Sequence, residues 1–600
     1  MNKNLLIFLY LPLFVIFFFF SGCSSKDEKI EAKVTFLTES KDIKFTNKSE
    51  ELQTLAFHST VPWKILELDA SWVEITPMNG DAGNNELSIK LLKKNSTIKR
   101  QAIAILVAGS TQESFYITFT PIKEDVAAEN IVLLQKKEKV LKGKSVQLTA
   151  KVEPEETTDQ IVWTSSNNDI ASVDPLGVVT GVNIGKATIT ASAGEVNDIC
   201  EIEVVEKYAT GGDGRTYTFE ALSQIPSSNV TLEEGSYVVN TDFEVSEGDI
   251  LKVQNKDLIK LKDKVSITIK GKADFAPTDT ATITRYDESA VPKNIYLTGA
   301  KGGGTFKNIS FVDVPIRLFA QQSSNFENCS FKDISSKNSA ITIASPMLTT
   351  IKQCFFLNNS YPAISNDPKL GSPILFENNY VYKNSNTARN RPQINIGPGG
   401  DNGEVKLINN TVIGPGEETT CGGIAISNLL GVKGANKVLI EKNTVTDCRY
   451  GITTTGPMYV EYIKNTIKNN RYDPNPMTGG SGISISSQAN GQVAKLTGNF
   501  ISGHLWGVTI IGNIEKGTGP DVNLGNLSEG KEYNPGLNEF KDNGNGGKLY
   551  DLYNNSAKDV YAQGNKWNVA VQDEMSIEDV ITHKKDDSNL GEVFFIPAGK

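Results

Sequence analysis

The chain has 600 residues with 60 Lys or Arg and 70 Asp or Glu, which gives a formal net charge of −10. An acidic chain without a basic cluster lacks the electrostatic footprint of a nucleic-acid-binding protein, so we expect no nucleic-acid partner. Only six cysteines occur, so the sequence does not predict a disulfide framework.

The first residues carry one lysine, and an unbroken apolar run follows over 5–20. Such a run is either a cleaved signal peptide or an uncleaved transmembrane helix, and the small residues before Cys23 favour cleavage. The phrase Phe20-Ser-Gly-Cys23 resembles the lipobox of bacterial lipoproteins. That resemblance implies a signal peptide over 1–22 and lipid attachment at Cys23, where two or more acyl chains would give stable anchoring.

The segment after Cys23, Ser24-Ser-Lys-Asp-Glu-Lys29, resembles the surface-export signal of Bacteroidetes lipoproteins. We therefore expect a tether over 23–29 and a lipid-anchored protein in the outer membrane, facing the cell exterior.

Residues 30–122 contain short alternating apolar runs with turns at 79–83 and 108–109, which predicts a small β-sandwich. The motifs around Trp63, Ser71-Trp72-Val-Glu-Ile-Thr-Pro77 and Arg100-Gln-Ala-Ile-Ala-Ile105 resemble the BACON domain of Bacteroidetes. That resemblance implies carbohydrate binding, and either tryptophan could stack on a sugar. Because a tryptophan in a small sandwich is more often a core residue, we expect Trp63 and Trp72 in the core.

A charged linker leads to a second β unit over 130–206, with strand-like runs such as Ile161-Val-Trp-Thr164 and Gly185-Lys-Ala-Thr-Ile-Thr-Ala191. Trp163, the strand pattern and Val178-Val-Thr-Gly181 resemble the bacterial immunoglobulin-like group 2 family. Such modules usually serve as spacers or adhesive units, so the resemblance implies a stalk rather than a specific chemistry.

From about Gly302 to Trp567, one short phrase returns at intervals of roughly 20 to 40 residues, a spacing typical of solenoids. It is rich in Val, Ile, Phe and Thr and too short for a helix, so each copy predicts one short strand of one coil. Five of the copies are Phe306-Lys-Asn-Ile-Ser-Phe311, Phe326-Glu-Asn-Cys-Ser-Phe331, Ile351-Lys-Gln-Cys-Phe-Phe356, Phe376-Glu-Asn-Asn-Tyr-Val381 and Leu407-Ile-Asn-Asn-Thr-Val412.

Stacked coils bury one another's apolar side chains, so residues at equivalent positions should stack on like residues. We expect one corner of the coils to hold a column of asparagines, which bond neighbouring amides and tolerate left-handed backbone. This column consists of Asn379, Asn410, Asn443, Asn465 and Asn499. Cys329 and Cys354 share one slot of consecutive coils, where they are either a disulfide or, as we expect, reduced core residues.

The pattern resembles the right-handed pectin-lyase-like β-helix family over the last two thirds of the chain. The alternative is a β-sandwich, but sandwich strands recur about every 8 to 12 residues. The predicted fold class is therefore all-β: two small β-sandwich domains followed by a right-handed parallel β-helix over 211–600. A capping box at Ser576-Ile-Glu-Asp579 predicts a short helix to about His583 that helps to close the C-terminal end.

The family resemblance implies either β-elimination or hydrolysis of an acidic polysaccharide. Elimination needs a cation near the uronate and a base, whereas hydrolysis needs two carboxyls on one face. The Gly-His-Gly phrase of polygalacturonases and the Trp-Ile-Asp-His phrase of pectate lyases are both missing from the sequence.

Polar and aromatic residues on neighbouring coils are the candidate site residues, because equivalent positions stack along one groove. Each also has an ordinary interpretation as a solvated turn residue, or for the histidine a satisfied core residue. The catalytic candidates are Asp447, Arg449, Asp473 and His504, and the glycan-binding candidates are Tyr450, Tyr472 and Trp506. Arg471 lies in the same groove set, and Arg389 and Arg391, in the insertion between Asn384 and Gln393, could overhang the same face.

No EF-hand-like loop supplies the six to eight oxygen ligands that Ca²⁺ prefers, so we identify no metal site or cofactor. Binding of Ca²⁺ stays an open alternative, because the chain contains short pairs of oxygen-bearing side chains: Asp401-Asn402, Asp542-Asn543 and Asp586-Asp587.

The leading functional hypothesis is a monomeric surface lipoprotein that binds a polysaccharide along its β-helix as a glycan-binding or adhesive protein. The alternatives are a polysaccharide lyase or glycoside hydrolase on the same fold, and a purely structural surface protein. An enzyme predicts two converging titratable groups with perturbed pKa values, whereas a binder predicts exposed aromatic side chains without such a pair.

Overall fold

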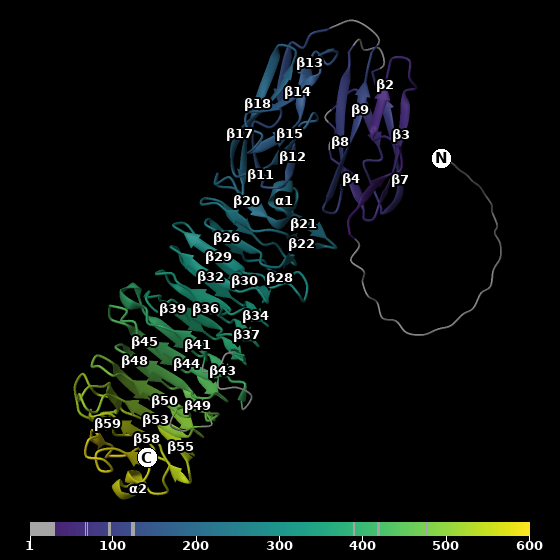
Figure 1. Cartoon of the computed structure of the whole chain (residues 1–600). Coiled ribbons are helices and arrows are strands. Elements are labelled where there is room, and N and C mark those ends of the chain that lie inside the picture. The colour runs from purple at the N-terminus through teal and green to yellow at the C-terminus, as the bar shows by residue number, and fades with distance from the viewer. Residues whose placement is uncertain are drawn as a thin grey trace, which may run out of the picture. The chain divides into compact units, whose positions relative to one another are not determined.

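A computed structural model describes residues 31–599 except 67, 69, 94–97, 122–125, 388–390, 417–420, 474 and 476–477. Cys23, the tether and Arg389 lie outside the described residues. The chain divides into two compact units, Met1–Glu124 and Asp125–Lys600, which are described separately below (Figure 1).

The first unit is a sandwich of a 4-stranded sheet in the order β1-β3-β7-β5 and a 5-stranded sheet in the order β2-β9-β8-β4-β6. Trp63 and Trp72 are both 3% exposed and pack in the core between the sheets, as predicted. The strands are β1 (Val34–Phe36), β2 (Asp42–Phe45), β3 (Leu52–Ser59), β4 (Trp63–Ile65), β5 (Val73–Thr76), β6 (Asn79–Gly80), β7 (Gly83–Leu91), β8 (Arg100–Ala108) and β9 (Thr111–Phe119).

The second unit begins with a small β domain that has its own apolar core, which includes Cys200 and Ile189. Its sheets are β10-β13, β11-β18-β17-β14 and β12-β16-β15. The strands are β10 (Asn130–Leu133), β11 (Lys137–Leu141), β12 (Ser145–Gln147), β13 (Ala150–Glu153), β14 (Ile161–Ser165), β15 (Ala171–Val173), β16 (Val178–Gly181), β17 (Gly185–Ala193) and β18 (Val196–Val205).

The rest of the second unit is a right-handed parallel β-helix, because successive strands pass in turn through three long sheets. We call them sheet A, sheet B and sheet C, with 14, 14 and 13 strands. Strand pairing within them is parallel throughout, apart from the antiparallel pair β21 and β22 in the first coil. Figure 1 shows the coils succeeding one another from β20 beside α1 to β58 near α2.

Sheet A contains β19 (Tyr208–Ala209), β23 (Phe243–Val245), β26 (Ser266–Ile269), β29 (Asn294–Gly299), β32 (Ile316–Ala320), β35 (Ile341–Ile343), β38 (Ile364–Asn366), β41 (Pro392–Ile396), β44 (Gly422–Ser427), β47 (Ile452–Thr455), β50 (Ser481–Ser486), β53 (Trp506–Ile511), β58 (Leu552–Asn555) and β60 (Ile581–Thr582).

Sheet B contains β20 (Thr216–Thr218), β24 (Ile250–Lys252), β27 (Lys272–Phe275), β30 (Gly303–Lys307), β33 (Ser324–Glu327), β36 (Thr349–Lys352), β39 (Ile374–Glu377), β42 (Val405–Ile408), β45 (Lys437–Glu441), β48 (Tyr459–Ile463), β51 (Val493–Thr497), β54 (Asp521–Gly525), β59 (Val560–Ala562) and β61 (Val593–Phe594).

Sheet C contains β21 (Val230–Glu233), β22 (Ser236–Val239), β25 (Leu258–Leu261), β28 (Ala281–Arg285), β31 (Ile309–Val312), β34 (Ser330–Lys332), β37 (Phe355–Leu357), β40 (Tyr380–Tyr382), β43 (Thr411–Ile413), β46 (Thr444–Thr446), β49 (Thr466–Lys468), β52 (Phe500–Ser502) and β55 (Glu539–Lys541). A short hairpin of β56 (Gly544–Asn545) and β57 (Lys548–Leu549) follows β55.

The repeated phrase marks a corner of the coil rather than one strand, which corrects the sequence prediction. In the copy at 306–311, β30 ends at Lys307, Asn308 has φ of 56°, and β31 begins at Ile309. Gln353 (φ 54°) and Asn378 (φ 57°) occupy the same position in later coils. One residue in the left-handed region turns the chain from sheet B to sheet C, so both flanking strands direct apolar side chains into the core.

The column of asparagines lies at this corner, as predicted. The Oδ1 atom of Asn410 accepts a hydrogen bond from the backbone N–H of Asn379 at 2.9 Å, and Asn443 does the same for Asn410 at 3.0 Å. The pattern continues through Asn465, Asn499, Asn538 and Asn565. The left-handed residue is the one before each of the asparagines at 379, 410 and 443, so these do not themselves adopt that geometry.

Like residues stack on like inside the coils. Phe306 and Phe326 have ring centroids 4.4 Å apart at an interplanar angle of 5°, and Phe331 and Phe356 are 4.9 Å apart at 6°. Cys329 and Cys354 are free thiols that are fully buried, which confirms the reduced core interpretation.

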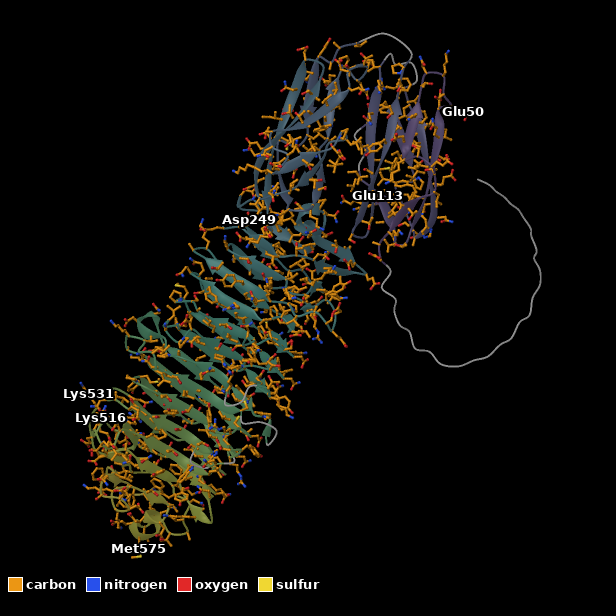
Figure 2. The ribbon with its side chains drawn as sticks, in the orientation of Figure 1. Glu50, Glu113, Asp249, Lys516, Lys531 and Met575 are labelled. Carbon is orange, nitrogen blue, oxygen red and sulfur yellow. The ribbon has the colours of Figure 1, made fainter. Side chains whose placement is uncertain are left out.

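Short helices lie at the two ends of the β-helix and beside one loop: α1 (Phe219–Ser223), η1 (Pro226–Ser228), η2 (Gly400–Asn402) and α2 (Glu574–Glu578). The α2 helix is capped by Asp573, whose carboxylate accepts from the Ser576 N–H at 2.8 Å. The predicted capping box was therefore misplaced by three residues, and the helix ends before His583. Met575 of α2 is 83% exposed and lies at the C-terminal end (Figure 2). Among the described residues, no helix has the length and apolar character needed to cross a membrane.

Candidate functional site

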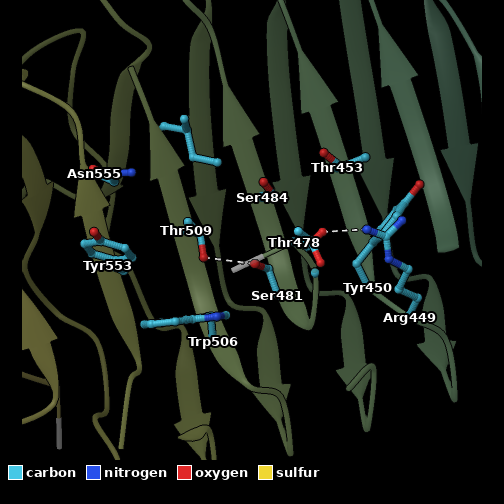
Figure 3. Close-up of a pocket in the computed structure, with 12 residues that line it drawn as sticks. Arg449, Tyr450, Thr453, Thr478, Ser481, Ser484, Trp506, Thr509, Tyr553 and Asn555 are labelled. Carbon is cyan, nitrogen blue, oxygen red and sulfur yellow. Dashed lines mark hydrogen bonds between the residues drawn. The ribbon is translucent and has the colours of Figure 1, made fainter. Parts of the chain in front are cut away.

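A hollow on the outer face of sheet A is the candidate site. It has a volume of about 270 Å³ and spans β47, β50, β53 and β58 (Figure 3). Its lining is mainly hydroxyl and aromatic: Arg449, Tyr450, Thr453, Thr478, Gly479, Ser481, Ser484, Trp506, Thr509, Ile511, Tyr553 and Asn555.

Strand register places these side chains in rows across the coils. Thr453 pairs with Ser484, Ser484 with Thr509, and Thr509 with Tyr553, so these four form one outward row. Side chains alternate between the two faces of a strand, so the residue directly before each row member points inward. These residues, Ile452, Ile483, Val508 and Leu552, are fully buried. The parallel ladder therefore fixes hydroxyl groups about 4.8 Å apart along the face.

A second group of residues, at the starts of the same strands, carries aromatic rings. Ser481, Gly482 and Ile483 are all buried, so the inward–outward alternation of β50 begins only at Ile483. Ser481 pairs with Trp506, and both line the hollow together with Tyr450 (Figure 3). The Trp506 ring centroid lies 4.4 Å from that of Tyr550 and 5.3 Å from that of Tyr553, the latter pair being stacked at 28°. The indole is half-buried, so two tyrosines hold it while part of it faces solvent.

An ion pair closes one end of the hollow. The Arg449 Nε–H donates to Asp473 Oδ2, and the Arg449 Nη2–H donates to the carbonyl oxygen of Thr478 at 2.6 Å. The side chains of Arg449 and Asp473 are 13% and 4% exposed. Burial alone would raise the pKa of Asp473, but hydrogen bonds from Arg449, the Asn475 amide and Thr478 outweigh burial and lower that pKa. The carboxylate therefore stays ionised and bound to its partner.

The tyrosines of the hollow remain protonated. Burial raises the pKa of Tyr450, whose ring lies over Gly422, where a Cβ atom would come within 2.1 Å of the ring. Burial also raises the pKa of Tyr553, with smaller contributions from Asp587 and Tyr550. A phenol with a raised pKa donates a hydrogen bond rather than acting as a base at neutral pH.

Four of the predicted site residues meet here. Tyr450, Trp506 and Arg449 line the hollow, and Asp473 holds Arg449 in place. Tyr472 is not among the lining residues, although its N–H reaches the Cys448 carbonyl.

Asp447 lies on the turn after β46 with φ of 59°, and Thr446 Oγ1 donates to its carboxylate at 3.0 Å. Neither Asp447 nor the solvent-exposed Arg471 lines the hollow. Arg391, which we expected to overhang this face, lies over the Tyr361 ring at 5.0 Å and is also outside the lining.

His504 corrects the prediction that it faces the groove. It is 0% exposed, its Nδ1 accepts from the Asn470 N–H at 3.1 Å, and its Nε2 bonds the Ile467 carbonyl at 3.0 Å. Asn470 makes the same pair of bonds in the coil before, to the Cys448 N–H and the Val445 carbonyl. The imidazole thus replaces an asparagine amide in a second ladder, and burial lowers its pKa to about 4.

Sequence reasoning missed the hydroxyl row and Tyr553. The only signal was the alternation in Ile452-Thr-Thr-Thr455, Ser481-Gly-Ile-Ser-Ile-Ser486 and Trp506-Gly-Val-Thr509, in which Ser or Thr alternates with buried residues. Each of these is also an ordinary strand pattern, so only the register of several coils together identifies the row.

The described residues contain no group of three or more His, Cys, Asp or Glu arranged to hold a metal ion. Several of the candidate Ca²⁺ oxygens are engaged in hydrogen bonds: the Asp586 carboxylate accepts from the His583 N–H at 3.0 Å, and Asn543 Oδ1 accepts from the His504 N–H at 3.2 Å.

Comparison with known proteins identifies one family. Residues 127–204 match the bacterial Ig-like domain (group 2). This agrees with the small β domain that begins the second unit, and it confirms the sequence resemblance for that segment.

Short segments of the chain are similar to curated proteins. An A type blood N-acetyl-alpha-D-galactosamine deacetylase of Flavonifractor plautii is 35% identical over 18% of this chain. A lacto-N-biosidase of Bifidobacterium bifidum is 27% identical over 24%, and a 3-O-alpha-D-galactosyl-alpha-L-arabinofuranosidase of Bifidobacterium longum subsp. longum is 34% identical over 16%. The matches span only 12%, 13% and 10% of the lengths of these relatives.

Among solved structures, the periplasmic alginate epimerase AlgG aligns with 67% of this chain and 86% of its own, at 11% identity and a TM-score of 0.38. An S-layer protein aligns with 30% of this chain at 16% identity and a TM-score of 0.13.

Proposed function

We propose that the β-helix binds a polysaccharide that lies across the coils of sheet A, and that the protein is a glycan-binding or adhesive protein of the cell surface. The observation that carries this proposal is the Trp506 platform, defined as Trp506 with Tyr550 and Tyr553 packed against it. Aromatic rings that combine an apolar face with a polar edge are favoured at binding surfaces. A ring that is already held in place loses little conformational entropy when a ligand binds.

Three of the other tryptophans, Trp63, Trp72 and Trp567, are each 3% exposed or less and lie in cores. Trp163 is half-buried, like Trp506, and packs against the core of the small β domain. Trp506 lies beside a row of hydroxyl groups that can bond sugar hydroxyls. The three curated relatives carry names of glycan-acting enzymes, which supports a glycan partner without identifying one.

The lining gives less support to an enzyme. Hydrolysis of a glycoside needs two carboxyls roughly 5 to 10 Å apart. No carboxylate or histidine lines the described part of the hollow, and the nearby Asp473 is held by Arg449. We therefore place binding before lyase or hydrolase activity.

The test is a panel of plant, host and microbial polysaccharides. Gel retardation of the full chain in glycan-loaded gels measures binding, while absorbance of unsaturated products and release of reducing ends measure cleavage, with and without Ca²⁺. We expect retardation without products. New unsaturated or reducing ends would instead establish a lyase or a hydrolase, and silence in all three assays would favour a structural protein.

The location is part of the proposal. We propose that acyl chains on Cys23 anchor the protein in the outer membrane with the β-helix facing the exterior. The Ig-like domain and the N-terminal sandwich, for which the BACON resemblance remains a prediction, would then serve as spacers or additional glycan-binding modules.

A further inference from the structure

We infer that the ligand of the Trp506 platform is a neutral glycan rather than a uronate polymer; this inference rests on the proposed function. It names the substrate class of the same site, and three properties of the surface carry it.

The first property is the charge of the lining. Arg449 is the single ionisable cation among the described residues of the hollow, and it is already bound by the Asp473 carboxylate and the Thr478 carbonyl. Both side chains are largely buried, so the pair is electrically balanced within the protein. A uronate carboxylate entering the hollow would lose water without gaining a cation of its own, and the loss of hydration would disfavour its binding.

The second property is the extent of the uncharged surface. The outward row that includes Thr453 carries no charged side chain between Thr342 and Tyr553, and a second row beside it is also uncharged. Beyond Thr342 the first row reaches Arg317, the register partner of Thr342. The first row, read from strand register, is Thr342, Ser365, Asn395, Ala425, Thr453, Ser484, Thr509 and Tyr553. The second is Ser427, Thr455, Ser486, Ile511 and Asn555.

The third property is the contrast with sheet B, which carries charges on its outer face. Lys307 pairs with Glu327 at 2.9 Å, and Lys352 pairs with Glu377 at 2.8 Å. The strands of sheet A carry charged side chains in earlier coils, at Glu244 and Arg317, so the uncharged stretch from Thr342 to Tyr553 is a feature of the coils around the hollow. The chain also carries a net charge of −10, which repels polyanions at low ionic strength.

Hydroxyl and aromatic side chains match a neutral sugar. Thr453, Ser484 and Tyr553 present groups that donate and accept hydrogen bonds, and Ser481 Oγ already bonds Thr509 Oγ1 at 2.9 Å, which fixes both. Trp506 offers an apolar ring face for the C–H side of a pyranose. Neither kind of contact depends on ionic strength.

The test compares polymers that differ only in charge. Gel retardation of the full chain is measured with neutral polysaccharides, with native uronate polymers, and with the same uronate polymers after reduction of their carboxyl groups, in about 50 and about 500 mM NaCl. We expect retardation by neutral and carboxyl-reduced polymers only, unchanged by salt and lost in Trp506→Ala.

Two outcomes overturn the inference in different ways. Tighter binding to the native uronate polymer, weakened by salt and lost in Trp506→Ala, would contradict neutrality but leave the proposed function standing. Retardation by no polymer, or retardation that Trp506→Ala does not change, would defeat the proposed function and this inference with it.

A charge-adding variant gives a second readout. Ser484→Arg places a new guanidinium on the outward row, with no buried partner to neutralise it. We expect this variant to gain affinity for the native uronate polymer by about tenfold or more and to become salt-dependent. Salt-independent binding to uronate by the unmodified protein, equal to that of the variant, would contradict the inference.

Discussion

Trp506 stacks on Tyr553 with ring centroids 5.3 Å apart and planes inclined by 28°, although 46 positions separate the two residues in the chain. The contact exists because β53 and β58 are neighbours in sheet A. A second tyrosine, Tyr550, packs on the same indole at 4.4 Å. The tryptophan is thus fixed before any ligand arrives, which lowers the entropy cost of binding.

The asparagine ladder should be a major source of stability. In Asn443→Ala, the backbone N–H and the Nδ2 of Asn410 lose their acceptor inside the core. We expect the free energy of unfolding to fall by roughly 2 to 4 kcal/mol, because buried donors without partners cost about 1 to 3 kcal/mol each. Urea denaturation of the full chain measures this loss. Asn325→Ala, at an exposed strand position, is the control and should shift stability by about 0.5 kcal/mol or less. Equal effects of the two variants would contradict the role of the ladder.

His504 should make the β-helix less stable in mild acid. The pKa of His504 is about 4 in the folded state and 6.5 in the unfolded state. Between these two pH values the unfolded chain binds a proton at this imidazole and the folded chain does not, so acid favours unfolding. The free energy of unfolding should therefore drop by about 3 kcal/mol between pH 6.5 and pH 4. In His504→Asn, an amide can make the same two bonds without titrating, so this drop should disappear. A variant that keeps the full acid sensitivity would show that other groups cause it.

Asp551 should make the β-helix less stable as the pH rises, the opposite of the effect of His504. It is 0% exposed, its carboxylate accepts from Asn543 Nδ2 at 3.1 Å and from the Asn568 N–H at 2.7 Å, and burial raises its pKa to about 7. Above the unfolded value of 3.8 the folded state retains a proton that the unfolded state has lost, so stability falls as the pH rises from about 4 to about 7. Asp551→Asn should remove this fall, whatever its absolute stability. Urea midpoints at pH 5 and pH 8 provide the comparison, and a persistent difference in the variant would refute the assignment.

Cys23 should carry the lipid. We expect Cys23→Ser to abolish incorporation of labelled palmitate and to move the protein out of the membrane fraction, since a thioether link to the lipid needs the thiol. Surface exposure of the unmodified protein is checked with extracellular protease on intact cells. Membrane retention of the unlabelled variant would instead indicate an uncleaved apolar anchor over 5–20.

The fold was largely predictable because stacking repeats one physical rule in every coil. Asn379 through Asn499 recur at the same place in each phrase, and the ladder follows directly from that recurrence. The strand boundaries were not predictable, since the phrase around Asn308 has apolar residues five positions apart whether it is a strand or a corner. A single left-handed residue decides between the two, and asparagine, lysine and glutamine all occupy that position.

The site was predictable only in part. Counting coils predicts Trp506, Tyr450, Arg449 and Asp473 as candidates along one groove, because equivalent positions stack. It does not predict the ion pair between Arg449 and Asp473. His504 was misplaced since its spacing from Asn470 shows neither which way the imidazole points nor that it belongs to a ladder. Thr453, Ser484 and Thr509 carry no distinguishing signal in sequence, because Ser and Thr are common on any solvated strand.

The most direct test of the central claim is the glycan affinity of Trp506→Ala against Tyr561→Ala, measured by calorimetry with the polysaccharide that retards the full chain. Tyr561 is a matched aromatic on sheet B, 43% exposed and packed on Phe594 at 5.4 Å. We predict that the loss of Trp506 weakens binding by about tenfold or more, while the loss of Tyr561 leaves it unchanged. Equal affinities for the two variants and the unmodified protein would show that the glycan does not bind on the Trp506 platform.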